Sequence, residues 1–256
     1  MKKSKKSLLE QLKLSHTEEA IRQRLENGPK HQYLKDFIYG AIDGTVTTFA
    51  VVAGVAGAHL SMGIVIILGV ANLVGDGFSI AVSSYLATRA EGDLRLKAKK
   101  EEEAHVATFP EGEKEEIRQI FKAKGFKGEE LEKIISTITS DVNVWVDTML
   151  NEEHKMPLIR SSPLRAGLST FSAFLVVGSI PLIPFFFKLL DPESLFNAFS
   201  WSVIATGIGF FIIGAFKSRF LGRKWFTTGM ETFLMGGGAA ALAYLVGRLL
   251  GNLGRI

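Results

Sequence analysis

The chain has 256 residues, of which 47% are hydrophobic and 22% are charged, and its formal net charge is +4 at pH 7. It contains no cysteine, which excludes disulfide bonds and thiolate metal sites. An excess of basic residues is also typical of nucleic-acid-binding proteins. Here the basic residues cluster beside apolar stretches, where membrane orientation accounts for them, so we expect no nucleic-acid partner.

Five long apolar stretches follow one another along the chain and are separated by charged segments. A helix of about 20 apolar residues crosses a hydrocarbon core about 30 Å thick. The sequence therefore predicts an all-α membrane protein, with membrane lipid as a partner. Its five transmembrane helices are expected at 37–60, 62–88, 166–190, 196–216 and 226–250.

Short connections and prolines refine this arrangement. The connection from His59 to Met62 is very short, which predicts a tight antiparallel pair formed by the first two spans. Pro181 and Pro184 predict a kink or an end in the third span, because proline lacks a backbone donor and clashes with the preceding turn.

The segment before the first span is polar, so we expect no cleavable signal peptide in it. Residues 8–27 are predicted to form a short amphipathic helix ended by Asn27-Gly28-Pro29. This helix lies either on the membrane surface or against the charged insert, and the sequence pattern is compatible with both positions.

A charged insert separates the second and third spans and holds most of the 26 acidic residues. Its apolar periodicity predicts three helices, from 89 to about 107, from Pro110 to Gly125, and from Gly128 to about Lys155. We therefore expect four parts along the chain: an N-terminal segment 1–34, spans at 35–88, the insert at 89–165, and spans at 166–256.

The basic residues predict the orientation of the chain in the membrane. Lysines dominate the tail before the first span, and the loop at 217–224 is also basic. Basic loops stay in the cytoplasm. We therefore expect the N-terminus and the insert on the cytoplasmic side and the C-terminus on the other side.

Acidic residues inside the spans are the first candidates for function. Asp43 lies in the first span and Asp76 near the middle of the second. An isolated carboxylate in lipid costs at least about 2.5–3.5 kcal/mol, so it faces a cavity, a partner or an ion. The centres of the spans offer almost no basic partner, so a shared cation or proton is favoured over a buried ion pair. Glu231 begins the fifth span, where transport and interfacial pairing with the basic loop are equally good interpretations.

The insert offers three pairs of metal-ligating side chains at helical spacing. Residues three or four apart share one helix face, and Glu-x-x-His is a spacing of metal-binding helical bundles. Carboxylates with an imidazole suit Fe²⁺, Mn²⁺ or Zn²⁺. A solvated charged face remains the alternative. The pairs are Glu102 with His105, Glu113 with Glu116, and Met149 with Glu153.

Three runs in the spans resemble the vacuolar iron transporter (VIT/CCC1) family. They are Asp43-Gly44-x-Val46-Thr47-Thr48-Phe49-Ala50 through Gly57, Ala71-Asn72-Leu73 through Arg89-Ala90-Glu91, and Gly236-Gly237-x-Ala239-Ala240-x-x-x-Tyr244-x-x-Gly247. The resemblance covers 35–250. It implies a five-span homodimer that exports cytosolic Fe²⁺, and often Mn²⁺, in exchange for protons.

The resemblance also implies roles for particular residues. It makes Asp43 a transport residue and assigns metal binding in the insert to Glu102, Glu113, Glu116, Met149 and Glu153. His105 stands where many members have glutamate, a conservative change for a metal site. The second span departs further, because Asn72, Ile80 and Ser84 replace the usual glutamate, methionine and glutamate.

We therefore expect a proton-coupled exporter of Fe²⁺ or Mn²⁺ whose pathway uses Asp43 and Asp76, with Asn72 and Glu231 as further pathway residues. The missing second-span ligands support an alternative, a membrane-anchored metal sensor or buffer without transport. No nucleophile–base pair or cofactor motif supports an enzyme, and we expect no tightly bound cofactor. The lack of a plant-type or fungal extension favours a prokaryotic plasma membrane.

Overall fold

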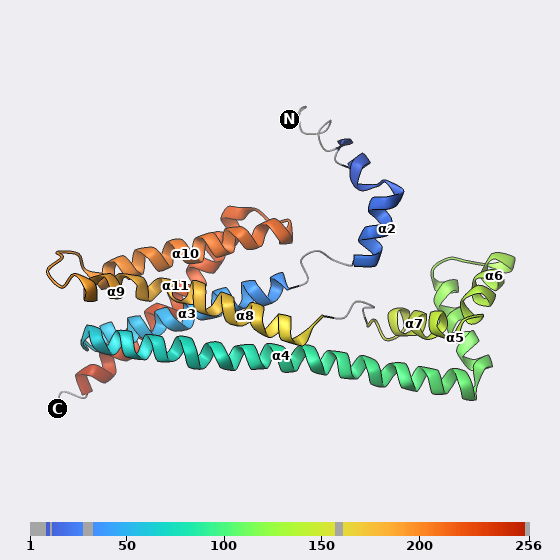
Figure 1. Ribbon diagram of the computed structural model, residues 1–256, viewed down its shortest axis with the longest axis horizontal. Helices are drawn as coiled ribbons and strands as arrows, with labels where there is room; N and C mark the ends of the chain where they lie inside the picture. The colour runs from blue at the N-terminus through green and yellow to red at the C-terminus, as the bar shows by residue number, and fades with distance from the viewer. Residues whose placement is uncertain (1–8, 11, 28–32, 157–160, 254–256) are drawn as a thin grey trace. The chain divides into compact units, whose positions relative to one another are not determined.

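The computed structural model describes residues 9–10, 12–27, 33–156 and 161–253, and every regular element in them is helical (Figure 1). The described parts of the chain divide into two compact units. One comprises Met1–Gln32 with Arg95–Arg160, and the other comprises Tyr33–Leu94 with Ser161–Ile256.

Five helical segments within the described residues are long and apolar enough to cross a membrane. This confirms the predicted all-α membrane protein. Their bounds are α3 Leu34–Gly57, α4 Met62–Thr108, the segment Pro163–Leu190, α10 Ala198–Leu221 and α11 Trp225–Leu253.

The third span is interrupted where the prolines predicted a kink. It consists of α8 (Pro163–Gly178), a single 3₁₀ turn η1 (Ile180–Leu182) and α9 (Ile183–Leu190) (Figure 1). Ser202 of α10, which is fully buried, donates a hydrogen bond of 2.6 Å to the carbonyl of Pro181. A side chain of a neighbouring helix thus binds a carbonyl at the break, as a backbone polar group in lipid requires.

Glycines let α3 approach two other helices at backbone distance. A Cβ at Gly44 would lie 2.6 Å from the carbonyl oxygen of Phe174 on α8. A Cβ at Gly57 would overlap the carbonyl oxygen of Tyr244 on α11, and one at Gly247 would overlap that of Gly54. Small residues are what allow such close packing between membrane helices.

The first two spans, predicted to form a tight antiparallel pair, share the apolar core and a hydrogen bond from Thr48 of α3 to Asn72 of α4, while the closest backbone approaches of α3 are to other helices. The glycines of α3 face α8 and α11, and α4 in turn approaches α8, where a Cβ at Gly167 would lie 2.9 Å from the carbonyl oxygen of Ala81. A short connection fixes the direction of the next helix, but small residues decide which backbones come closest.

Much of the apolar surface of α4 is exposed in the single chain. Ile67 is 69% exposed, Val74 59% and Phe78 65%, and Asp76 lies in the same exposed stretch. Apolar side chains on this surface suit lipid or another apolar surface, but a carboxylate does not.

The insert unit packs around its own apolar core. Its helices are the end of α4, α5 (Pro110–Ala123), α6 (Gly128–Thr139) and α7 (Val142–Glu152). The core joins Ile117 of α5 and Ile135 of α6 to Trp145, Met149 and Leu150 of α7.

The predicted third helix of the insert, from Gly128 to Lys155, is wrong because it is two helices. Asp141 has extended backbone and caps α7, since its carboxylate accepts hydrogen bonds from the amides of Asn143 and Val144. An N-cap side chain of this kind satisfies amides that would otherwise lack partners at a helix start.

The N-terminal segment shows a similar break. Residues 12–15 are helical and α2 spans Glu18–Asn27, so the helix predicted over 8–27 is divided. The hydroxyl of Thr17 accepts a hydrogen bond of 3.3 Å from the amide of Ala20. Thr17 therefore caps the start of α2. Residues 8 and 11 of the predicted helix lie outside the described residues.

Candidate metal centre

Glu102 is the buried acid around which the other candidate ligands of the insert gather. It lies on α4, and its side chain is only 4% exposed. His105 follows one turn later, with Nδ1 3.9 Å from Glu102 Oε1. The same Nδ1 lies 3.6 Å from Oε1 of Glu113 at the start of α5. The structure thus brings together Glu102, His105 and Glu113, with ligand atoms within 4.8 Å of one another.

The other predicted ligands of the insert lie beside this group. Glu116, one turn after Glu113, interacts with Glu153 at the end of α7, and the two residues line a common cleft. Met149 is fully buried in the apolar core. It lies one turn before Glu153 on the same helix end.

Burial and mutual repulsion make these carboxyls hard to ionise in the metal-free protein. Burial, followed by the charges of Glu116 and Glu102, raises the pKa of Glu113 to about 7. Burial and the neighbouring Glu153 raise the pKa of Glu116. Since each carboxylate is stabilised by a nearby positive charge, a cation among them would favour their ionised forms.

Two oxygen atoms in this group are buried and lack a hydrogen-bond partner among the described residues. They are Oε2 of Glu102 and Oε2 of Glu113. A buried carboxylate oxygen without a partner is costly. Carboxylate oxygens and imidazole nitrogens are ligands of divalent transition metals, so the arrangement is able to hold such an ion.

His154 belongs to this group, although the sequence did not single it out. Its Nε2 lies 2.9 Å from Glu102 Oε1, and with Glu153 it forms a second trio whose ligand atoms lie within 4.8 Å. The hydrogen bond to Glu102 raises the pKa of His154. Spacing could not reveal it, because neighbouring residues point apart on a helix. The helix ends here, and that allows both Glu153 and His154 to approach Glu102.

The acids inside the spans form a separate cluster in the other unit. Asn72 of α4 donates a hydrogen bond to the carboxylate of Asp76, and Thr48 of α3 donates one of 3.4 Å to the Asn72 side-chain oxygen. Asp43 of α3 is half-buried and is repelled by the charge of Asp76. The structure thus brings Asp43, Asn72 and Asp76 into one polar cluster between α3 and α4.

Glu231 lies apart from that cluster. Its carboxylate is 3.7 Å from a guanidinium nitrogen of Arg223, in the basic connection between α10 and α11. This pair favours the structural interpretation of Glu231, an interfacial acid that balances the basic loop.

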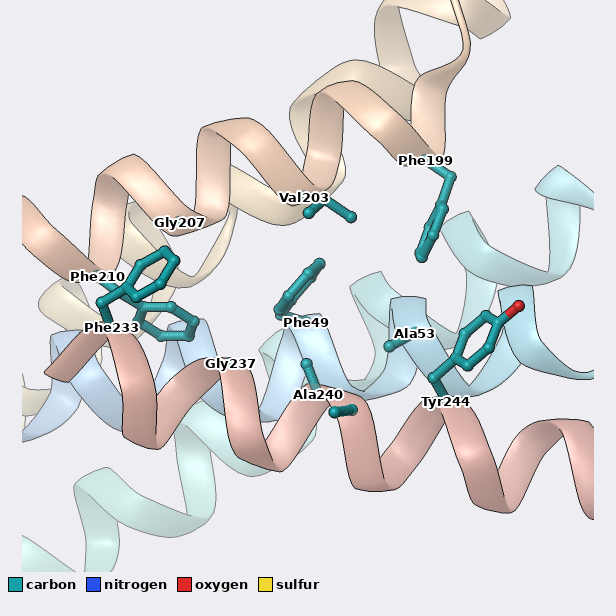
Figure 2. A pocket seen from close by; sticks show the side chains of 11 residues that line it. Phe49, Ala53, Phe199, Val203, Gly207, Phe210, Phe233, Gly237, Ala240 and Tyr244 are labelled. Carbon is teal, nitrogen blue, oxygen red and sulfur yellow. The ribbon is translucent and has the colours of Figure 1, made fainter. Parts of the chain in front are cut away.

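An apolar pocket of about 340 Å³ lies among α3, α10 and α11. Figure 2 shows Phe49 of α3, Phe199 and Phe210 of α10, and Tyr244 of α11 around it. Of its lining side chains, only that of Tyr244 carries an oxygen. The pocket therefore lacks the ligands that a divalent metal requires.

Comparison with known proteins identifies relatives over most of the chain. A sequence model described as the VIT family matches residues 34–248. The chain is 30% identical over 222 residues to "Vacuolar iron transporter 1" of Arabidopsis thaliana, an alignment that covers 86% of each protein. It is 32% identical over 228 residues to the "Vacuolar iron transporter" of Plasmodium falciparum, covering 86% of this chain and 82% of that protein.

A third relative, the "Vacuolar iron transporter" of Toxoplasma gondii, is 32% identical over 226 residues, which cover 85% of this chain and 74% of that protein. All three relatives are eukaryotic proteins named after the vacuole. They give no support to the prokaryotic plasma membrane expected from the sequence.

Proposed function

The chain belongs to the VIT family, and we propose that it carries Fe²⁺, and also Mn²⁺, out of the cytosol across a membrane in exchange for protons. The main supporting observation is the group of carboxylates and imidazoles around Glu102, in which Glu102 and Glu113 are buried and each has an oxygen without a hydrogen-bond partner among the described residues. The names of its relatives, which are iron transporters, support the choice of metal.

The insert collects the metal in this proposal. Glu102, His105, Glu113, Glu116 and Glu153 hold it, and Met149 adds a thioether from the adjoining core. The carboxyls must lose protons to bind, so loading is coupled to proton release. We therefore expect the site to bind metal at cytosolic pH and to bind it more weakly as the pH falls.

The polar cluster between α3 and α4 provides the path through the membrane. Asp43 and Asp76 repel each other when both are ionised, which favours either one shared proton or one shared cation. Asn72 bonds Asp76 and contributes an amide oxygen to the same cluster. Alternation between proton and metal at two such carboxyls is the exchange that coupled transport requires.

A homodimer is part of the proposal. α4 exposes a broad apolar surface that includes Asp76, and a second copy would shield that carboxylate from lipid. The proposal predicts twice the chain mass in mild detergent and in lipid. A monomer in both media contradicts it.

The test is metal flux into proteoliposomes under a pH gradient, with Fe²⁺, Mn²⁺ and Zn²⁺ compared. We expect the native chain to carry Fe²⁺ and Mn²⁺ against a counterflow of protons. Asp43→Asn and Asp76→Asn should each abolish flux, because asparagine keeps the shape and removes both the charge and the titratable proton. Asp191→Asn, in an exposed loop, is the control and should transport normally.

Normal flux in Asp76→Asn would make Asp76 structural and leave the path to Asn72, Glu231 or backbone carbonyls. Metal binding by the insert without flux in the native chain would favour the second candidate, a membrane-anchored sensor or buffer. The uncharged Asn72, Ile80 and Ser84 on α4 are the observation that supports this candidate.

A further inference from the structure

A left-handed turn fixes the position of His154 just beyond α7. Lys155 has φ +55°, a conformation that costs a non-glycine residue roughly 1 kcal/mol. The amide of Met156 donates a 2.9 Å hydrogen bond to the carbonyl of Leu150, and Met156 packs against the core of the insert. The turn is therefore held by a backbone bond and by a buried side chain, and it keeps His154 beside the end of α7.

Arg95 of α4 also contacts this part of the chain. It donates a 3.4 Å hydrogen bond to the carbonyl of Met156 and forms a 3.3 Å ion pair with Asp147 of α7. The end of α7 is thus tied to α4 one to two turns before Glu102. His154 Nε2 reaches Glu102 Oε1 at 2.9 Å as a consequence of this built position.

The two carboxylate oxygens of Glu102 differ in their hydrogen-bond partners. Oε1 meets His154 at 2.9 Å and His105 at 3.9 Å. Oε2 is buried and has no hydrogen-bond partner among the described residues, and the side chain of Glu102 is only 4% exposed. A buried, unpartnered oxygen on a carboxylate whose other oxygen faces two imidazoles is a position that a cation would satisfy.

Imidazole and carboxylate ligands differ in the metals they select. Imidazole suits Zn²⁺, Fe²⁺ and other later ions, whereas carboxylate, carbonyl and water ligands suit Mn²⁺. A second imidazole beside Glu102 therefore changes which metal ion the insert prefers more than another carboxylate would.

We propose that His154 is a metal ligand of the insert, facing the same Glu102 oxygen as His105, and that it biases the insert toward nitrogen-preferring divalent ions over Mn²⁺. This inference rests on the proposed metal binding by the insert. It names His154 as a residue that determines which metal the insert prefers.

The test compares Zn²⁺ and Mn²⁺ affinity of the full chain in detergent, measured by competition with a chromophoric chelator. His154→Gln keeps an amide donor for Glu102 but removes the imidazole. We expect it to weaken Zn²⁺ binding at least about tenfold while Mn²⁺ binding changes less than about threefold. His16→Gln, an exposed histidine of the N-terminal segment, is the matched control and should change neither affinity.

X-ray absorption at the zinc edge, with concentrated protein in excess over Zn²⁺ so that the ion is bound in both proteins, counts the imidazole ligands independently of affinity. Two imidazoles in the native chain and one in His154→Gln support the inference. Equal weakening of both metals makes His154 only a positioning residue for Glu102, and an unchanged Zn²⁺ to Mn²⁺ ratio also overturns the inference. If the native chain binds neither metal, the proposed loading of the insert fails instead.

Discussion

Replacing Glu113 with glutamine should flatten the pH dependence of metal binding by the insert. Glu113 is buried beside Glu102 and Glu116, and its pKa is raised to about 7 in the metal-free protein. A carboxyl must be ionised to bind a metal, so protonation of Glu113 competes with the ion. Glutamine keeps nearly the same shape and cannot titrate.

The size of the effect follows from that pKa. With a pKa of about 7, roughly one-tenth of the Glu113 carboxyls are ionised at pH 6 and roughly nine-tenths at pH 8. This group alone should therefore weaken metal binding about tenfold at pH 6 relative to pH 8, or about 1.4 kcal/mol. His154, whose pKa is also raised, adds to the dependence in the native chain and in the variant alike.

The assay is calorimetric titration of the full chain with Mn²⁺ at pH 6, 7 and 8, in buffers of different ionisation enthalpy to count the protons released. Glu113→Gln should bind more weakly at pH 8 but lose about one tenfold step of the pH dependence. Glu115→Gln is the matched control on the same helix. Glu115 is exposed, and its hydrogen bond from Arg118 keeps its pKa below the usual range.

Either of two results would refute this reasoning: a native affinity that is equal at pH 6 and pH 8, or an unchanged pH dependence in Glu113→Gln. The same pKa has a consequence for the metal-free protein. Folding raises the pKa of Glu113 from 4.5 to about 7, so the folded state binds more protons than the unfolded state in that window. Stability of the metal-free insert should fall as pH rises from about 4.5 to about 7, and His154 contributes in the same direction.

Three further predictions concern the fold. Gly247→Ala should lower thermal stability in detergent, by about 1–3 kcal/mol, because its Cβ would overlap a carbonyl oxygen of α3, whereas Gly238→Ala has open space and should be neutral or stabilising. Asp141→Ala should cost about 1 kcal/mol and increase amide exchange at the start of α7, since it removes the cap; unchanged exchange there would contradict the capping role. In this cysteine-free chain, a thiol at Leu195 should react with an impermeant reagent from outside intact cells and one at Glu115 only after permeabilisation, and the reverse pattern would invert the topology.

Apolar length and proline chemistry were sufficient to predict the spans. Each span is a run of apolar residues with few charges, and the break in the third span lies at Pro181, where proline chemistry predicted it. The partners of α3 could not be predicted in the same way. Gly44 and Gly57 allow close helix approach, but the positions of small residues in a sequence do not say which helix approaches.

The insert shows where periodic patterns stop being informative. The apolar stripe continues in step across Asp141, so the pattern joined α6 and α7 into one helix although the chain turns there. Helical spacing found Glu102 with His105 and Glu113 with Glu116, because those pairs lie within helices. It missed His154, which reaches Glu102 only because the helix has ended and Lys155 turns the chain.

The glycine contacts of α3 limit which substitutions evolution can accept. At Gly57 and Gly247 any side chain would overlap the backbone of the facing helix, and the cost cannot be relieved by moving a flexible side chain. At Gly92 and Gly238 nothing lies within 4 Å of an added Cβ. Lineages descended from this protein should therefore retain glycine at the first two positions while the latter two drift, and this difference would mark the helix contacts in sequences alone.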